Sequence, residues 1–211
     1  MSKSGLSYKM TLLGDSGVGK TSLFKKLFTG KFDPRIISTI GVDKRSLNIS
    51  INTDEGEKDV DISLFDTAGQ ERFRSISISY FRESSGFFVM YDITSDESFQ
   101  NVQQWLNDIK NNLGNISKYL IILLGNKLDI ALEDSTKREV KEKDADEFCQ
   151  NNDIFWGGEC SVKDFSVDDL KEMFKKFVEE LYKKVGANVK RSESILVPPD
   201  KKRTGGSHRC S

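Results

Sequence analysis

The chain has 211 residues, of which 36% are hydrophobic and 31% are charged, a composition typical of a folded globular protein. Its 32 basic and 33 acidic residues nearly cancel, which argues against a general nucleic-acid binder. The longest apolar runs are far shorter than a membrane-spanning helix requires, and the first residues do not form a secretion signal. The cysteines are few and odd in number, and the single histidine lies near the C-terminus. Disulfides, zinc and histidine catalysis are therefore not expected.

Short apolar runs alternate with longer amphipathic segments along the chain. The apolar runs predict strands at 8–13, 45–51, 60–65, 86–91, 119–124 and 154–156. The amphipathic segments predict helices at 20–28, 76–81, 97–113, 136–151 and 167–185. A turn-forming segment at 52–58 predicts a hairpin, so one edge strand is antiparallel. The expected fold class is α/β, with a six-stranded, mostly parallel sheet, one antiparallel edge strand and five flanking helices.

The last part of the chain differs in composition from the rest. From Lys183 onward there are eight basic and two acidic residues, and after Val185 the pattern dissolves into Gly, Ser, Pro and charge. Such a segment cannot bury enough apolar surface to fold. We predict one domain over 1–185 and a disordered tail over 186–211.

A glycine-rich phosphate-binding motif lies between the first predicted strand and helix. The segment from Gly14 to Thr21 reads G-D-S-G-V-G-K-T and matches G-x-x-x-x-G-K-[ST]. The glycines let backbone N–H groups curl around an anion, and the helix N-terminus adds partial positive charge. Lys20 can reach the outer phosphates, and the Thr21 hydroxyl can ligate Mg²⁺. A turn that only joined strand to helix would not need Lys and Thr at these positions.

A second motif can select the base. Asn126, Lys127, Leu128 and Asp129 follow a buried strand, at the edge where parallel sheets bind ligands. A carboxylate there can accept hydrogen bonds from the two N–H groups on the pairing edge of guanine, whereas adenine offers no such pair. The loop at 159–163 could close over the same base. Alone, N-K-x-D is equally well explained as a solvated polar loop, but after a phosphate loop it indicates guanine.

With these motifs the chain resembles a small GTPase of the Ras superfamily, and most closely its Rab branch. The segment at 66–71, D-T-A-G-Q-E, resembles the second switch of the family, and the segment at 38–43, S-T-I-G-V-D, resembles the first switch of Rabs. The segment at 91–94, Y-D-I-T, is also Rab-like. The resemblance implies a single P-loop GTPase domain that binds GTP or GDP with Mg²⁺.

The resemblance also implies roles for individual residues. The nucleotide would be bound by Asp15, Ser16, Gly17, Val18, Gly19, Lys20, Thr21, Ser22, Phe32, Thr39, Gly69, Asn126, Lys127, Asp129, Ser161, Val162 and Lys163. The metal would be bound by Thr21 and Thr39, with Asp66 acting through water. Gln70 would orient the attacking water and Lys20 would neutralise developing charge, as the catalytic residues. The Val162 N–H would meet the guanine carbonyl. Phe32 is open to a second interpretation, as packing beside the helix.

Three positions depart from the Rab pattern. Lys44 stands where an aromatic residue is usual, Phe65 replaces a tryptophan, and Val162 replaces an alanine. Lys44 can be read as a solvated strand-edge charge or as part of an effector surface that accepts an acidic partner residue. Cys149 and Cys160 are interpreted as buried packing residues, and Trp105 and Phe99 as core.

The tail carries a candidate membrane anchor. Cys210 is followed by a single residue, which is neither a C-a-a-X box nor the paired cysteines of most Rabs. By resemblance it would be geranylgeranylated, with an unmodified thiol as the alternative. Lys201, Lys202 and Arg203 would add attraction to anionic lipid. The implied location is cytoplasmic, reversibly on the cytoplasmic face of an endomembrane or the plasma membrane.

The leading hypothesis is a switch that hydrolyses GTP slowly and regulates vesicle traffic. The implied partners are an exchange factor, a GTPase-activating protein, effectors of the GTP state, a Rab escort protein and a GDP-dissociation inhibitor, with no nucleic acid and a monomeric chain. One alternative is a guanine-nucleotide-binding adaptor with little or no hydrolysis, against which the presence of Gln70 argues. A phosphoryl-transfer enzyme acting on a small acceptor is a third, and the base-reading motif argues against it.

Overall fold

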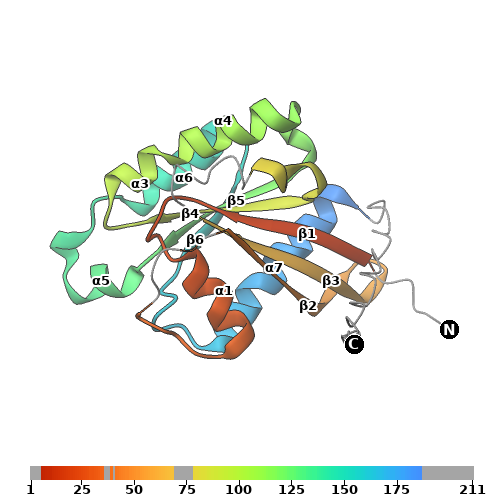
Figure 1. Cartoon of the computed structure of the whole chain (residues 1–211), viewed down its shortest axis with the longest axis horizontal. Coiled ribbons are helices and arrows are strands. Elements are labelled where there is room, and N and C mark those ends of the chain that lie inside the picture. Colours follow the sequence, from red (N-terminus) through yellow and green to blue (C-terminus); the bar gives the residue numbers. More distant parts are fainter. Residues whose placement is uncertain (1–5, 36–38, 40, 69–77, 187–211) are drawn as a thin grey trace, which may run out of the picture.

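The computed structural model describes residues 6–35, 39, 41–68 and 78–186. Its centre is a six-stranded sheet with the order β2-β3-β1-β4-β5-β6 (Figure 1). The strands are β1 (Leu6–Leu13), β2 (Val42–Thr53), β3 (Gly56–Thr67), β4 (Gly86–Asp92), β5 (Leu120–Asn126) and β6 (Phe155–Glu159). The edge strand β2 pairs antiparallel with β3, and every other pair is parallel. The predicted fold class is confirmed.

Helices cover both faces of the sheet (Figure 1). One face carries α1 (Lys20–Thr29) and α7 (Val167–Val185), and the other carries α3 (Asp96–Gln100), α4 (Val102–Leu113) and α6 (Glu142–Asn152). A short helix, α5 (Leu128–Glu133), directly follows β5. Three 3₁₀ turns complete the described elements, η2 (Phe81–Glu83), η3 (Ile116–Lys118) and η4 (Ser135–Lys137).

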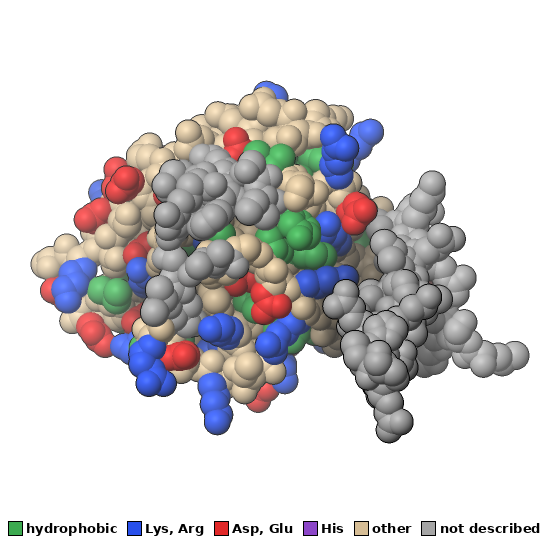
Figure 2. Space-filling model, in the orientation of Figure 1, with side chains coloured by type: hydrophobic (Ala, Val, Ile, Leu, Met, Phe, Trp, Pro, Cys, Tyr) green, Lys and Arg blue, Asp and Glu red, His purple; other side chains and the backbone are tan. Residues whose placement is uncertain are grey.

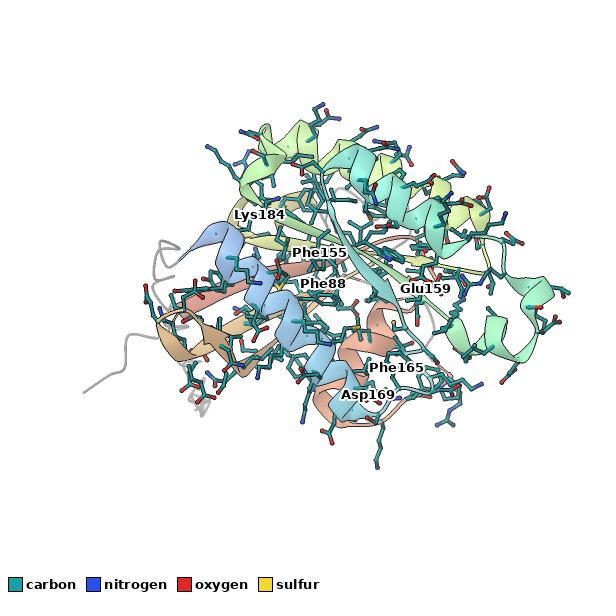
Figure 3. The ribbon with its side chains drawn as sticks, turned by 180° about the vertical axis from the view of Figure 1, so that it is seen from behind. Phe88, Phe155, Glu159, Phe165, Asp169 and Lys184 are labelled. Carbon is teal, nitrogen blue, oxygen red and sulfur yellow. The ribbon has the colours of Figure 1, made fainter. Side chains whose placement is uncertain are left out.

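The core is split by the sheet into two apolar clusters. In β4, Phe88 packs with α1 and α7, whereas Phe87 and Val89 pack with α4 and α6. Side chains alternate between the faces of a strand, so a strand covered on both sides must be apolar throughout. This explains the continuous apolar runs in the sequence. Figure 3 shows α7 crossing the sheet near Phe88, whose ring lies 4.8 Å from that of Phe174.

Local signals fix the ends of several elements. Ser166 accepts a hydrogen bond from the Asp169 N–H, and the Asp169 carboxylate accepts one from the Ser166 N–H, which forms a capping box at the start of α7. In the predicted hairpin, Thr53 pairs with Gly56. Gly56 has φ of +106°, a conformation that other residues adopt only with strain.

Two of the predicted helices have different bounds. The helix expected at 136–151 is wrong in its first part, because the N–H groups of Glu139 and Val140 both donate to the Ile93 carbonyl and hold this segment across the end of β4. Helix α6 begins only at Glu142, and α5 was not predicted. The helix expected at 97–113 is divided at Asn101 into α3 and α4. The helix expected at 76–81 lies partly outside the described residues.

Candidate functional site

The phosphate loop joins β1 to α1, as the motif predicts. Gly19 is the N-cap of α1, and its φ of +106° is left-handed. A Cβ atom added to Gly19 would lie 2.1 Å from Nδ2 of Asn126, and one added to Gly14 would lie 2.2 Å from the Met90 carbonyl oxygen. The glycines therefore let the loop approach β4 and the base-binding segment closely.

Lys20 places a positive charge under this loop. Its side chain is almost fully buried, and Nζ donates hydrogen bonds to the carbonyl oxygens of Gly14 at 2.7 Å and Asp15 at 2.6 Å. Burial lowers the pKa of Lys20 to about 8, against the opposing effect of the carboxylates of Asp66 and Asp15. A bound polyphosphate would favour the charged form of Lys20 and so offset the cost of its burial.

Three oxygen-bearing side chains meet next to Lys20. The hydroxyls of Thr21 and Thr39 are within hydrogen-bonding distance of each other, although eighteen positions separate them. Asp66, at the end of β3, is 1% exposed, and its Oδ1 has no hydrogen-bond partner among the described residues. Burial raises the pKa of Asp66 to about 6, partly offset by the Thr21 hydroxyl and Lys20. A buried carboxylate oxygen beside two hydroxyls fits Mg²⁺, which prefers oxygen ligands.

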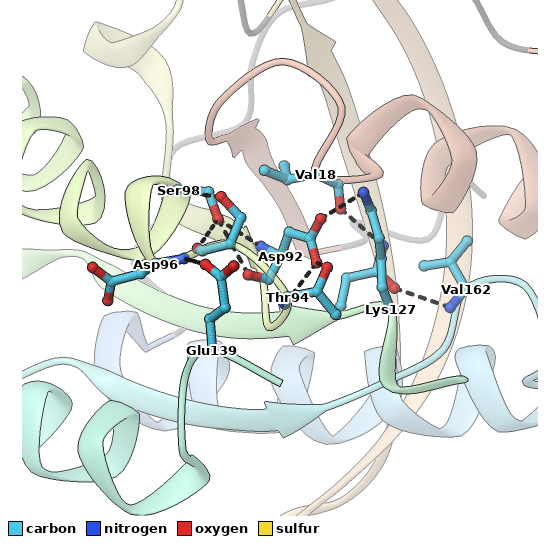
Figure 4. A network of polar contacts seen from close by, with 10 residues as sticks. Val18, Asp92, Thr94, Asp96, Ser98, Lys127, Glu139 and Val162 are labelled. Atoms are coloured by element: carbon cyan, nitrogen blue, oxygen red, sulfur yellow. Dashed lines mark hydrogen bonds and ion pairs between the residues drawn. The ribbon is translucent and has the colours of Figure 1, made fainter. Parts of the chain in front are cut away.

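The base-binding segment is braced on both sides. Asn126 Nδ2 donates to the Val18 carbonyl at 2.8 Å, and Asn126 Oδ1 accepts from the Val162 N–H at 3.1 Å (Figure 4). In this structure the Val162 N–H is therefore directed at Asn126, which differs from the expected bond to a guanine carbonyl. Asn126 links the phosphate loop to the loop after β6, and this cross-link explains why an amide with both donor and acceptor stands there.

Asp129, the residue expected to read guanine, is held from the same loop. Ser161 Oγ donates to Asp129 Oδ1 at 2.8 Å, and Lys163 Nζ lies 3.5 Å from Oδ2. Ser161 therefore supports the Asp129 carboxylate from the loop after β6. Asp129 is largely buried but borders the cavity, so its carboxylate is fixed in direction.

Lys127 is held by Asp92, a residue to which the sequence analysis assigns no role in the site. Lys127 is the N-cap of α5, with φ of +71°, and its Nζ lies 2.6 Å from Oδ2 of Asp92 (Figure 4). Asp92 also accepts hydrogen bonds from the N–H and hydroxyl of Thr94. The Y-D-I-T segment noted in the sequence thus fixes the Lys127 side chain beside the cavity.

These groups surround a cavity of about 540 Å³. Most of the predicted nucleotide-binding residues line it, namely Ser16, Gly17, Gly19, Lys20, Thr21, Ser22, Phe32, Thr39, Asn126, Lys127, Asp129, Val162 and Lys163. Four further residues line the cavity although no motif in the sequence indicates them, namely Asp33, Pro34, Thr67 and Ile130. Gly69, Gln70 and Cys210 lie outside the described residues. Phe32 both lines the cavity and packs against the core, so its two interpretations are compatible.

Asp15 faces away from the cavity. Its carboxylate accepts hydrogen bonds from Asn101 Nδ2 at 2.7 Å and Trp105 Nε1 at 2.9 Å, at the start of α4. Its side chain is therefore engaged behind the phosphate loop, which leaves its backbone as the part available to a ligand. Trp105 is buried in the core, as expected, and it also has this polar contact.

Two of the three residues that depart from the Rab pattern, Lys44 and Phe65, lie together outside the cavity, whereas Val162 lines it. The rings of Phe65 and Tyr80 are 5.4 Å apart, and the ammonium groups of Lys9 and Lys44 lie 4.5 Å and 5.4 Å from the centre of the Phe65 ring. Figure 2 shows hydrophobic side chains bordered by basic ones over this part of the sheet. Lys44 is exposed on the edge strand β2 beside the Phe65 ring, which fits both a solvated strand-edge charge and an effector surface, so both interpretations stay predictions.

The remaining sequence expectations concern cysteines and membranes. Cys149 and Cys160 are free and buried, as predicted. Within the described ranges, the helices are all too short or too polar to span a bilayer.

Comparison with known proteins identifies the family. The profile of the Ras family matches residues 9–183. The chain is 40% identical to Ras-related protein Rab-30 of Homo sapiens over 167 residues, and this match covers 79% of this chain and 76% of the relative. It is 35% identical over 209 residues to Ras-related protein Rab-13 of Mesocricetus auratus, and the match covers 97% of this chain and 95% of the relative. It is 39% identical over 153 residues to Ras-related protein Rab-27B of Bos taurus, and the match covers 69% of this chain and 67% of the relative.

The geometry and the comparisons agree. A phosphate loop, a set of oxygen ligands and a braced carboxylate surround one cavity, in a chain whose relatives are Rab proteins along most of its length. The chain belongs to the Ras family and is a Rab-type small GTPase, which binds GTP or GDP with Mg²⁺ and hydrolyses GTP to GDP.

Proposed function

We propose that the two ends of the cavity bind different parts of the nucleotide, one end the phosphates and the other the base. Lys20 and the phosphate loop bind the phosphates, and Asp129 accepts from the two N–H groups on the pairing edge of guanine. The observation that carries this proposal is the position of a buried ammonium and a braced carboxylate on the walls of one cavity. Adenine would not supply these two donors to the Asp129 carboxylate, and a buried acceptor that loses hydrogen bonds on binding costs affinity.

We propose that Thr21 and Thr39 ligate Mg²⁺ and that Asp66 holds the ion through water. When bound, the ion neutralises charge on the β- and γ-phosphate oxygens. Lys20 adds a second positive charge where negative charge grows, and Gln70 orients the water that attacks the γ-phosphate. No arginine in the motifs is placed to complete the site, so we expect slow turnover until a GTPase-activating protein assists.

The proposed switch depends on Thr39 and Gly69. Both would contact the γ-phosphate, and its loss on hydrolysis would release the segments that carry them. Effectors that contact these segments would distinguish GTP from GDP. The contact between the Thr21 and Thr39 hydroxyls supports this arrangement, because Thr39 lies beside Thr21, the other proposed metal ligand.

The proposed cellular role is the regulation of vesicle-mediated membrane traffic by a domain at 1–185 with a targeting tail at 186–211. The tail would carry one lipid on Cys210 and a basic cluster at 201–203. One lipid chain gives only reversible membrane binding, and the basic residues would strengthen it on an anionic leaflet. The expected partners are the exchange factor, the activating protein, effectors, the escort protein and the GDP-dissociation inhibitor, at the cytoplasmic face of an endomembrane or the plasma membrane.

A single-turnover assay distinguishes the switch from an adaptor that binds guanine nucleotides without hydrolysis. Purified protein loaded with GTP should hydrolyse it far more slowly than the ~10 per second of a median enzyme. Gln70→Leu should reduce the rate strongly while GDP affinity stays unchanged. No hydrolysis by either protein would favour the adaptor. Equal affinity for GTP and ATP in calorimetry would contradict the proposed role of Asp129.

A further inference from the structure

Two adjacent lysines on α1 have opposite environments. Lys25 is exposed, whereas Lys26 is only 6% exposed. Lys26 Nζ donates hydrogen bonds to the carbonyl oxygens of Val162 at 2.9 Å and Lys163 at 2.8 Å. A buried ammonium is costly unless it is hydrogen-bonded, so these two bonds explain how Lys26 is accommodated.

The two carbonyls belong to the loop that braces the base-binding segment. The N–H of Val162 donates to Asn126, and the ammonium of Lys163 lies near the carboxylate of Asp129. Lys26 thus binds one side of a loop whose other groups hold the two side chains expected at the base. Figures 1 and 3 both show this loop, between β6 and α7, beside α1.

Backbone bonds fix the loop at its two ends but not at this point. The Cys160 N–H donates to the Gly125 carbonyl where the loop leaves β6, and the Phe165 N–H donates to the Ser161 carbonyl before α7. Hydrogen bonds from a charged donor are stronger than neutral ones, and two of them on successive carbonyls fix the direction of a peptide segment. Lys26 therefore sets the position of Val162 and Lys163 relative to α1.

We propose that Lys26 is a positioning residue that determines base specificity, by holding the 160–163 loop against α1 so that Asn126 and Asp129 face the base. This inference rests on the proposed role of Asp129 in reading guanine. Helix α1 begins with Lys20 and Thr21, and Lys26 follows within two turns of the same helix. A rigid helix thereby connects the phosphate end of the cavity to its base end.

The test compares Lys26→Met with wild type. Methionine keeps an unbranched apolar stem and removes the donor, so it leaves two carbonyls unpaired without leaving a buried charge. The affinities for GDP and IDP are measured by calorimetry. IDP lacks the exocyclic amine of guanine, so wild type should bind GDP more tightly. We expect Lys26→Met to weaken GDP binding by about tenfold or more and to bring the GDP and IDP affinities closer together.

The matched control is Lys25→Met, the same change on the neighbouring exposed residue, which should retain both affinities. Lys26→Arg keeps the charge and donors and should recover most of the GDP preference. A variant that only destabilised the fold would lose GDP and IDP binding in the same proportion, and circular dichroism establishes that each variant is folded. If circular dichroism shows that Lys26→Met is not folded, Lys26→Gln, whose shorter side chain retains a donor, is measured in its place.

The outcomes separate this inference from the function on which it rests. If wild type prefers GDP but Lys26→Met has the same ratio of GDP to IDP affinity, the positioning role of Lys26 is wrong. If wild type itself does not distinguish GDP from IDP, the proposed role of Asp129 fails instead. A reduced ratio in Lys26→Met with retention in Lys25→Met supports the inference.

Discussion

The indole of Trp105 donates a 2.9 Å hydrogen bond to the carboxylate of Asp15 and so connects α4 to the back of the phosphate loop. Trp105 is 2% exposed, and Asn101 donates to the second carboxylate oxygen of Asp15. A loop that must present its backbone to phosphate needs its side chains fixed elsewhere. The phosphate loop is thus positioned from outside the cavity as well as by its own glycines.

Trp105→Phe should therefore destabilise the protein and weaken nucleotide binding. The change keeps most of the ring but removes one donor to Asp15, which we expect to cost about 1–3 kcal/mol of unfolding free energy. Urea unfolding at a fixed GDP concentration and calorimetric titration with GDP measure the two effects. The control is Trp156→Phe, at the only other tryptophan, which should leave GDP affinity unchanged. Equal GDP affinity in Trp105→Phe and wild type would show that this contact does not position the loop.

Gly19→Ala should be far more damaging than an alanine at another left-handed glycine. Gly19 and Gly56 both have φ of +106°, but a Cβ at Gly19 would lie 2.1 Å from Asn126 Nδ2, whereas none of the described atoms lies within 4 Å of a Cβ at Gly56. Gly56→Ala should cost only the backbone strain, about 1–2 kcal/mol. Gly19→Ala should also displace Asn126 and strongly reduce GDP affinity. The pair would be compared by thermal unfolding and GDP titration, and similar GDP affinities would refute the expected clash.

The salt bridge between Arg138 and Glu159 should contribute measurably to stability. Its two hydrogen bonds are 2.6 Å and 2.7 Å long, and the Glu159 side chain is largely buried. The same hydrogen bonding raises the pKa of Arg138. Arg138→Met leaves Glu159 without this partner and should cost about 2–3 kcal/mol. Adding Glu159→Gln should recover part of the loss, since the unpaired buried charge is then removed.

A chemical denaturation series measures these variants. The control is Lys143→Met, which breaks an exposed pair with Glu147 on α6 and should change stability by less than about 0.5 kcal/mol. If Arg138→Met and Lys143→Met have the same stability, the Arg138 pair contributes no more than a surface ion pair.

The buried cysteines should be unreactive in the folded protein. Burial raises the pKa of Cys149 and of Cys160 to about 12, so at pH 8 both remain as unreactive thiols. In a Cys210→Ser variant, a colorimetric thiol reagent at pH 8 should react only after denaturation, when both remaining cysteines become accessible. Rapid labelling of either cysteine in the native variant would contradict the described burial.

The order of elements and the two ends of the site could be predicted because each is encoded locally. An alternation of apolar runs with amphipathic segments requires strands covered by helices on both faces, and the order G-x-x-x-x-G-K-T specifies a loop whose glycines adopt conformations that other residues avoid. The capping box at Ser166 and the hairpin before Gly56 are local in the same way. By contrast, the helix predicted at 136–151 includes Val140, whose N–H instead donates to the distant Ile93 carbonyl.

The sequence alone determined the fold class, the phosphate-loop motif and the N-K-x-D motif that we propose selects the base, because these depend on neighbouring residues. The tertiary structure decided which partner each polar group took: Asp15 with Trp105, the Val162 N–H with Asn126, and Lys26 with the carbonyls of Val162 and Lys163. These partners lie 36 to 137 positions apart in the chain. A buried donor must find an acceptor, but its own segment does not encode which acceptor the packed sheet and helices will bring within reach.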